Sequence, residues 1–160
     1  MSAWRGRWGG RLAALALGAP LALAFPRPGL WWLAFVGLAP LLLLAAAARD
    51  RREAAVRAWL GGTGFFLAVN LFLAPKVGPF MVPLALLLGA LWLPLGWLAW
   101  RLLGRPTVGR LAAALALLPS VLVVGEAVRS WEGFGGPWGL LGASQWNHPP
   151  TLAVAALGGV

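Results

Sequence analysis

The chain has no cysteine, no tyrosine and one histidine, and only four of its 160 residues are acidic. Without cysteine it contains no disulfide, no thiol nucleophile and no thiolate metal site. A single histidine, His148, excludes a zinc site built from several imidazoles. We therefore expect no cofactor and no metal ion in this chain.

Charged residues of either sign are scarce, at 11% of the chain, whereas 61% of the residues are hydrophobic. Soluble domains carry about 25% charged residues. The composition therefore predicts an all-α, polytopic membrane protein. We expect a bundle of about five transmembrane helices, followed by an extracytoplasmic loop rich in Gly, Pro and Trp and by the start of a further element after Pro150.

Five apolar segments are candidates for membrane crossings. They are Leu12 to Phe25, Leu30 to Ala48, Ala58 to Ala74, Phe80 to Trp100 and Leu111 to about Val128. The first is short, because an upright crossing needs about 20 residues. It also ends in Ala22-Leu23-Ala24, which is typical of a signal-peptide cleavage site. The apolar segments that follow at short spacing favour a membrane hairpin over an exported soluble domain.

Proline, glycine and charged residues separate these segments. Residues 26–29 and 75–79 contain Pro and Gly and are predicted turns. Residues 49–57 are read as a charged loop, and Pro40 as a kink in the second segment. The third segment is rich in glycine, which allows close helix packing, and its Asn70 is read as a link between helices more than as a ligand.

The basic residues indicate the orientation. With five crossings and a cytoplasmic N-terminus, ten of the thirteen Lys and Arg residues fall on the cytoplasmic side and three on the other. This is the asymmetry of the positive-inside rule, and it places residues 129–150 on the extracytoplasmic face. Because the bases lie in short loops between apolar segments, the net charge of +9 does not indicate nucleic-acid binding.

The most informative stretch runs from Gly125 to Trp146, where charges, tryptophans and glycines gather after the last apolar segment. Glu126 and Arg129 share a helix face and can either pair or contact a lipid head group. Trp138 is either an interfacial anchor or a wall of a substrate cleft. Ser144 and His148 lack the pattern of a hydrolytic pair, and no catalytic constellation is present.

Three short motifs in this stretch occur in the order and spacing of a known family. They are Glu126-x-x-Arg129-x-Trp131, Gly135-x-Pro137-Trp138 and Gly142-x-Ser144-Gln145. They resemble the region after the fifth membrane helix of bacterial apolipoprotein N-acyltransferases. Residues 24–35 are similar to that family's first periplasmic turn and second helix, and the resemblance covers about residues 11–160.

The resemblance implies a multi-pass, monomeric enzyme of the bacterial inner membrane that works in two steps. A cysteine takes an acyl chain from a phospholipid and passes it to the diacylglyceryl-cysteine at a lipoprotein's N-terminus. The family's Glu-Lys-Cys triad belongs to a nitrilase-like domain expected after residue 160. Residues 1–160 are then its N-terminal transmembrane domain, inactive alone and in contact with membrane lipids.

Within this domain the resemblance points to a lipid cleft and to no catalytic residue. The residues expected to line or brace that cleft are Trp138, Trp131, Arg129, Glu126 and Gln145. The alternative reading is a small, non-enzymatic membrane scaffold or anchor protein. A transporter ranks last, because only Asn70 and Thr63 offer polar groups within the spans. A reading frame that continues into a soluble domain with Glu, Lys and Cys would separate the first two readings.

Overall fold

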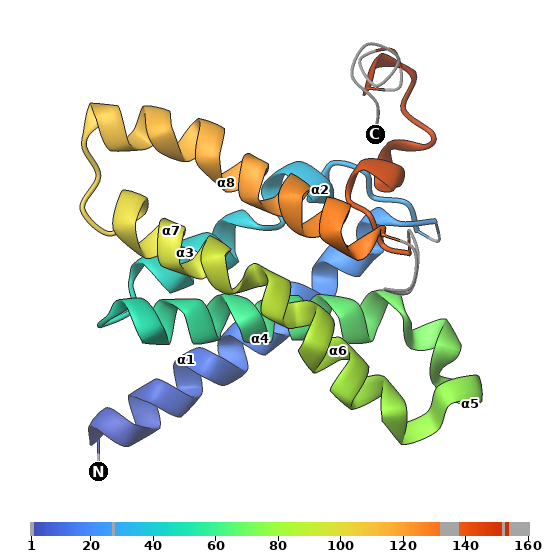
Figure 1. The fold of residues 1–160 in the computed structure, drawn as a ribbon, viewed down its shortest axis with the longest axis horizontal. Helices are drawn as coiled ribbons and strands as arrows, with labels where there is room; N and C mark the ends of the chain where they lie inside the picture. The colour runs from blue at the N-terminus through green and yellow to red at the C-terminus, as the bar shows by residue number, and fades with distance from the viewer. Residues whose placement is uncertain (1, 27, 132–137, 152, 154–160) are drawn as a thin grey trace.

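A computed structural model describes residues 2–26, 28–131, 138–151 and 153, and the regular structure in this part of the chain is entirely helical (Figure 1). The prediction of an all-α protein is confirmed. The α-helices are α1 (Ser2–Gly18), α2 (Leu33–Val36), α3 (Ala39–Ala46), α4 (Arg51–Val69), α5 (Ala74–Val77), α6 (Met81–Gly89), α7 (Leu93–Leu103) and α8 (Val108–Arg129). Short 3-10 helices are η1 (Ala19–Ala24), η2 (Leu71–Leu73), η3 (Gly78–Phe80), η4 (Ala90–Trp92) and η5 (Gly142–Gln145).

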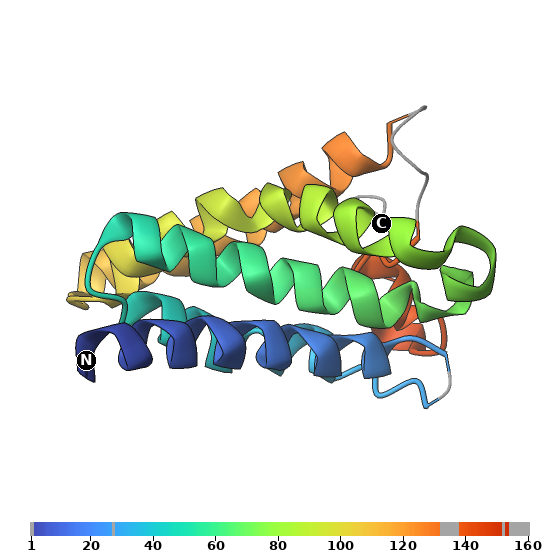
Figure 2. The same ribbon diagram turned by 90° about the horizontal axis from the view of Figure 1, so that it is seen from below.

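Helix α4 is the centre of the bundle. It packs against α1, α3, α6 and α7, and α8 packs on α7. Figure 2 shows these long helices stacked side by side, with α4 between α1 and the α6–α7 run. In the core, the rings of Phe65 and Trp92 stack at a centroid distance of 5.6 Å. The fold is thus built around the most glycine-rich of the predicted segments.

Glycine brings the backbones of α1 and α4 into contact. A Cβ atom added to Gly18 would lie 1.8 Å from the carbonyl oxygen of Gly61, and one added to Gly64 would lie 2.0 Å from that of Leu15. No other residue fits at either position without moving a helix. The close packing predicted from the small residues of α4 is confirmed.

The boundaries of α4 differ from the prediction. The helix begins at Arg51, well before Ala58, so most of the stretch read as a charged loop is helical. The carboxylate of Asp50 accepts a hydrogen bond from the backbone N–H of Glu53 at 2.9 Å, which is a helix N-cap. At the other end the amide of Asn70 donates to the carbonyl oxygen of Phe66 in its own helix, so Asn70 caps α4 and does not link two helices.

Two predicted breaks are present. The second apolar segment divides at Gly37 and Leu38 into α2 and α3, and Pro40 stands in the first turn of α3. The chain reverses between α4 and α6 through η2, α5 and η3, and Gly78, the first residue of η3, has a φ of +54° that favours glycine. The first segment is longer than expected, because α1 and η1 together run from Ser2 to Ala24.

Two helical stretches have the length and composition of membrane spans, Leu71–Leu103 and Val108–Arg129. Only 33% and 11% of their most apolar windows are buried within the molecule, whereas the core helix of a soluble protein would be mostly buried. The segment Leu33–Ala46 is apolar but shorter. Their length, composition and outward-facing apolar surface make these two stretches candidate membrane spans.

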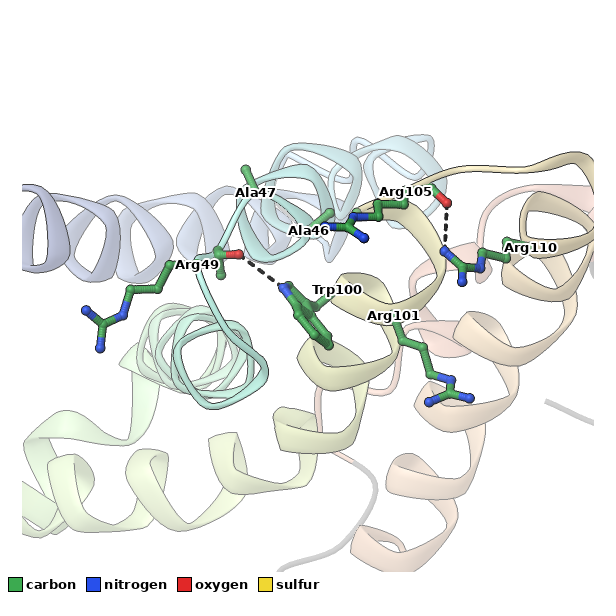
Figure 3. A pocket seen from close by; sticks show the side chains of 9 residues that line it. Ala46, Ala47, Arg49, Trp100, Arg101, Arg105 and Arg110 are labelled. Carbon is green, nitrogen blue, oxygen red and sulfur yellow. Dashed lines mark hydrogen bonds between the residues drawn. The ribbon is translucent and has the colours of Figure 1, made fainter.

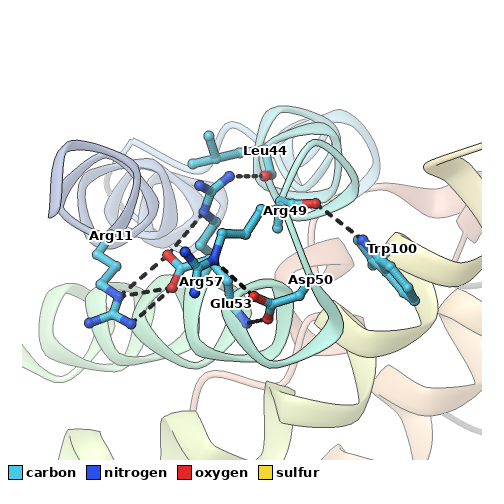
Figure 4. Close-up of polar contacts among 8 residues, drawn as sticks. Arg11, Leu44, Arg49, Asp50, Glu53, Arg57 and Trp100 are labelled. Carbon is cyan, nitrogen blue, oxygen red and sulfur yellow. Dashed lines mark hydrogen bonds and ion pairs between the residues drawn. The ribbon is translucent and has the colours of Figure 1, made fainter. Parts of the chain in front are cut away.

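The two ends of the bundle differ in composition. The N-terminus, the α3–α4 connection and the α7–α8 connection lie at one end, and α5 and residues 138–151 lie at the other (Figures 1 and 2). At the first end Glu53, only 4% exposed, accepts hydrogen bonds from Arg11 at 2.9 Å and Arg57 at 3.4 Å (Figure 4). Arg57 also donates to the carbonyl oxygen of Leu44 at 2.7 Å, so this ion cluster ties α1, α3 and α4 together.

Candidate functional site

The last turn of α8 holds the segment that follows it. The guanidinium of Arg129 donates through Nη1 to the backbone carbonyl oxygen of Trp138. The carboxylate of Glu126 accepts a hydrogen bond from the backbone N–H of Leu141 at 2.6 Å. The two side chains therefore bind backbone groups of residues 138–141, and they do not form the direct ion pair that their spacing allows.

Arg129 is buried, with 3% of its surface exposed. Its guanidinium carbon lies 5.1 Å from the centroid of the Phe66 ring, a favourable cation–π distance. Its Nη2 has no hydrogen-bond partner among the described residues. Arg129 is also one of the residues that line a cavity of about 10 Å³. Such a space holds at most about one water molecule, so Arg129 braces the site from inside.

The two tryptophans of the predicted site point outward. Trp138 is 59% exposed, and its ring lies 5.8 Å from that of Phe72, while Trp131 at the end of α8 is 72% exposed. Arg129 fixes the backbone of Trp138 while leaving its indole free. An exposed indole on a fixed backbone is suited to contact lipid at the membrane interface.

Gln145 is buried, with only 8% of its surface exposed, so its side chain does not face outward. Its amide donates to the carbonyl oxygen of Trp31 at 3.1 Å and to the hydroxyl of Ser144 at 3.0 Å. The imidazole of His148 stacks on the ring of Trp31, with centroids 3.9 Å apart. Gln145 and His148 thus attach residues 138–151 to the connection before α2.

Ser144 and His148 do not act together. The Ser144 hydroxyl donates to the carbonyl oxygen of Leu141 at 2.6 Å, and Nδ1 of His148 lies 3.2 Å from the hydroxyl of Thr151. Within the described ranges, no three His, Asp or Glu side chains gather as a metal site requires.

An apolar groove of about 360 Å³ lies between η4, the start of α7 and the C-terminal half of α8. Its lining residues are Ala90, Leu91, Pro94, Leu117, Ser120, Val121, Val124, Gly125 and Val128. Leu91 and Gly125 also line the small cavity beside Arg129. The groove suits a hydrocarbon chain, and sequence reasoning missed it because its residues are those of any apolar helix.

Only some of the residues predicted to form the site therefore lie on the surface of the molecule. Trp138 and Trp131 are exposed, whereas Arg129 and Gln145 are interior braces. The loop of Gly133 to Pro137, part of the second motif, lies outside the described residues. Trp31 and His148 were not predicted to belong to this site. They are far apart in the chain, and a contact between such distant residues leaves no local pattern in the sequence.

Residues 17–160 match the family model of the apolipoprotein N-acyltransferase N-terminal domain. The chain belongs to the apolipoprotein N-acyltransferase family. It is 34% identical to the apolipoprotein N-acyltransferase of Chromobacterium violaceum over 93% of this chain, and 37% identical to that of Azotobacter vinelandii over 96%. The relative from Geobacter metallireducens is 30% identical over 93% of the chain.

The chain spans about 30% of the length of these curated relatives. What it shares with them is the N-terminal domain of the family. The comparison with solved structures found no significant match.

Proposed function

We propose that this chain is the membrane domain of an enzyme that transfers an acyl chain from a phospholipid to the N-terminal diacylglyceryl-cysteine of lipoproteins. The observation that carries the proposal is the match of residues 17–160 to the N-terminal domain of the family. The catalytic Glu-Lys-Cys triad then lies in a nitrilase-like domain after residue 160. The chain itself supplies no catalytic residue and acts as a monomer.

The reaction divides into two acyl transfers at one cysteine of that domain. Its thiolate attacks an ester carbonyl of the phospholipid, so a thioester forms and a lysophospholipid leaves. The α-amino group of the acceptor then attacks the thioester, an amide forms and the thiol is released. Both substrates are anchored in the membrane, so a helical domain that presents them laterally would serve both steps.

We place the chain in the bacterial inner membrane with five crossings and a cytoplasmic N-terminus. The outward apolar surfaces of Leu71–Leu103 and Val108–Arg129 support insertion. The ten-to-three distribution of basic residues supports the orientation. Residues 129–150 then lie at the extracytoplasmic face, where the acceptor lipoproteins are exposed.

Within this placement the segment after α8 forms the lipid entrance. Trp138 and Trp131 contact the substrate lipid, because both rings are exposed and tryptophan favours the membrane interface. Glu126 and Arg129 position the backbone of residues 138–141. Gln145 positions the same segment by its hydrogen bond to Trp31.

A chimera tests the proposal. Residues 1–160 would replace the matching N-terminal region of the Azotobacter vinelandii relative, and membranes containing the chimera would be assayed for acyl transfer from phospholipid to a diacylglyceryl lipopeptide. We expect activity from the chimera and none from residues 1–160 alone. A membrane-inserted, folded chimera without activity would favour the scaffold reading. Activity of residues 1–160 alone would place the chemistry in this chain.

A further inference from the structure

A second cavity lies at the end of the bundle opposite Trp138, between the ends of α3 and α7 and the start of α8 (Figure 3). It has a volume of about 640 Å³, and we refer to it as the arginine pocket. Four arginines line it, namely Arg49 from the α3–α4 connection, Arg101 from the end of α7, Arg105 from the α7–α8 connection and Arg110 from the first turn of α8. Its size falls within the range of ligand sites, which is about 300–1,000 Å³.

The positive charge of the arginine pocket is largely uncompensated. No carboxylate lines it among the described residues. Arg49 pairs with Asp50 at 2.9 Å, and Arg110 donates to the carbonyl oxygen of Arg105 at 2.9 Å. The side chains of Arg101 and Arg105 form no ion pair or hydrogen bond with the described residues, although Arg101 lies 5.7 Å from the Trp97 ring.

Two other arginines at the same end of the bundle have a buried carboxylate as a partner. Arg11 and Arg57 share the buried carboxylate of Glu53, which offsets one of their two positive charges. In the arginine pocket, by contrast, only Arg49 has a carboxylate partner, and the exposed guanidiniums of Arg101, Arg105 and Arg110 have none among the described residues. An anion from outside the chain would satisfy them.

The remaining walls of the arginine pocket are rigid and small. The indole N–H of Trp100 donates to the carbonyl oxygen of Ala48 at 3.1 Å, which fixes α7 against the end of α3. Ala46 to Ala48 leave the cavity open because their side chains are short. A Cβ atom added to Gly104 would lie 3.2 Å from the carbonyl oxygen of Ala46, so the two helix ends approach closely.

We propose that the arginine pocket binds the phosphate of an anionic phospholipid head group. Guanidinium groups bind phosphate oxygens in a bidentate geometry. Basic pockets between membrane helices on the cytoplasmic side are suited to anionic head groups. Trp97 and Trp100 belong to the interfacial region where such head groups lie. The inference rests on the membrane placement proposed above, and it is independent of acyl transfer.

The test is a lipid titration of the whole chain in detergent, with bound lipids counted by native mass spectrometry. Phosphatidylglycerol is the probe, phosphatidylcholine is the neutral comparison, and millimolar inorganic phosphate is the competitor. Membrane insertion of the wild type is first verified by its resistance to carbonate extraction. The variant Arg101→Gln/Arg105→Gln removes the two uncommitted charges, and Arg51→Gln/Arg52→Gln removes the same charge at the same end outside the arginine pocket.

We expect the affinity for the first phosphatidylglycerol to fall about tenfold in Arg101→Gln/Arg105→Gln, because charge-assisted hydrogen bonds are lost, and to stay near the wild-type value in the control. Ala47→Phe keeps every charge but fills the cavity, so it is expected to weaken binding as well. If circular dichroism shows that the double variant does not fold, the lipid affinity of Ala47→Phe still tests whether the arginine pocket binds the head group.

Three results would overturn the proposal. Equal losses in the two double variants would mean that net charge alone attracts the lipid. Unchanged affinity in folded Ala47→Phe would mean that the cavity is not used. Displacement of the lipid by inorganic phosphate would assign the arginine pocket to a free anion in place of a head group.

Discussion

The guanidinium of Arg129, at the end of α8, donates a hydrogen bond to the backbone carbonyl oxygen of Trp138, nine residues further along the chain. This contact fixes the start of the segment 138–151 to the most membrane-like helix of the bundle. Because the bond goes to the backbone, the indole of Trp138 stays exposed. The buried guanidinium of Arg129 therefore fixes the position of the exposed indole of Trp138.

Replacing Arg129 by Gln should loosen the segment that it holds. A hydrogen bond to a charged group contributes about 1.5–3 kcal/mol, so amide hydrogen exchange of residues 138–141 should accelerate by about one to two orders of magnitude. Exchange followed by mass spectrometry measures this directly. Arg105→Gln is the control, because the Arg105 side chain makes no hydrogen bond among the described residues. Equal protection in wild type and Arg129→Gln would show that the contact does not hold the segment.

Trp138→Ala should lower acyl transfer by the active chimera without affecting membrane insertion, because the indole faces outward and makes few contacts with the core. The matched control is Trp146→Ala, which removes another half-exposed tryptophan. Turnover with a diacylglyceryl lipopeptide would be measured for both. If Trp138→Ala and Trp146→Ala are equally active, Trp138 has no role at the lipid entrance.

Replacing Glu53 by Ala should destabilise the bundle strongly. It leaves Arg11 and Arg57 without their shared carboxylate, and breaking a buried ion pair in this way costs about 3–5 kcal/mol. The unfolding temperature in detergent would report the loss. Arg49→Gln, which breaks an exposed pair with Asp50, should have little effect. A small change in both variants would mean that the ion cluster contributes no stability.

Gly64→Ala tests the contact between α1 and α4. A methyl group there would overlap the carbonyl oxygen of Leu15, and overpacking of this kind costs about 1–3 kcal/mol. Gly9→Ala is the control, because nothing lies within 4 Å of a Cβ atom at that position in α1. Thermal unfolding should show a loss only in Gly64→Ala. Similar stability in both variants would contradict the close backbone approach.

The helical class and most of the helix positions could be predicted from the sequence, because long apolar segments and Pro-Gly breaks act locally. The start of α4 could not be predicted, because the charged residues from Arg51 to Arg57 are typical of a polar loop. They form a helix here because Glu53 is buried and pairs with Arg11 of α1. The sequence predicted that Glu126 and Arg129 either pair or contact a lipid head group, whereas each side chain binds a backbone group. Their partners were missed, because backbone groups at residues 138 and 141 carry no side-chain signature.

The cap of α4 gives the chain a specific pH dependence. The pKa of Asp50 lies below its ordinary value of 3.8, mainly because its carboxylate accepts the N–H of Glu53 and further because Arg49 lies beside it. A group whose pKa is lower in the folded state stabilises that state above the unfolded pKa, and this contribution disappears as the pH falls through the folded pKa. The stabilisation from Asp50 is therefore complete above 3.8 and is lost below it.

Asp50→Asn isolates this contribution, because asparagine also caps a helix but does not titrate. The unfolding temperatures of wild type and Asp50→Asn would be measured from near neutral pH down through 3.8. We expect the wild type to be the more stable at neutral pH and the difference to shrink as Asp50 takes up its proton. The two proteins are otherwise identical in sequence, so contributions from the rest of the chain cancel in the difference. A difference that does not change with pH would mean that the charge of Asp50 contributes nothing to the start of α4.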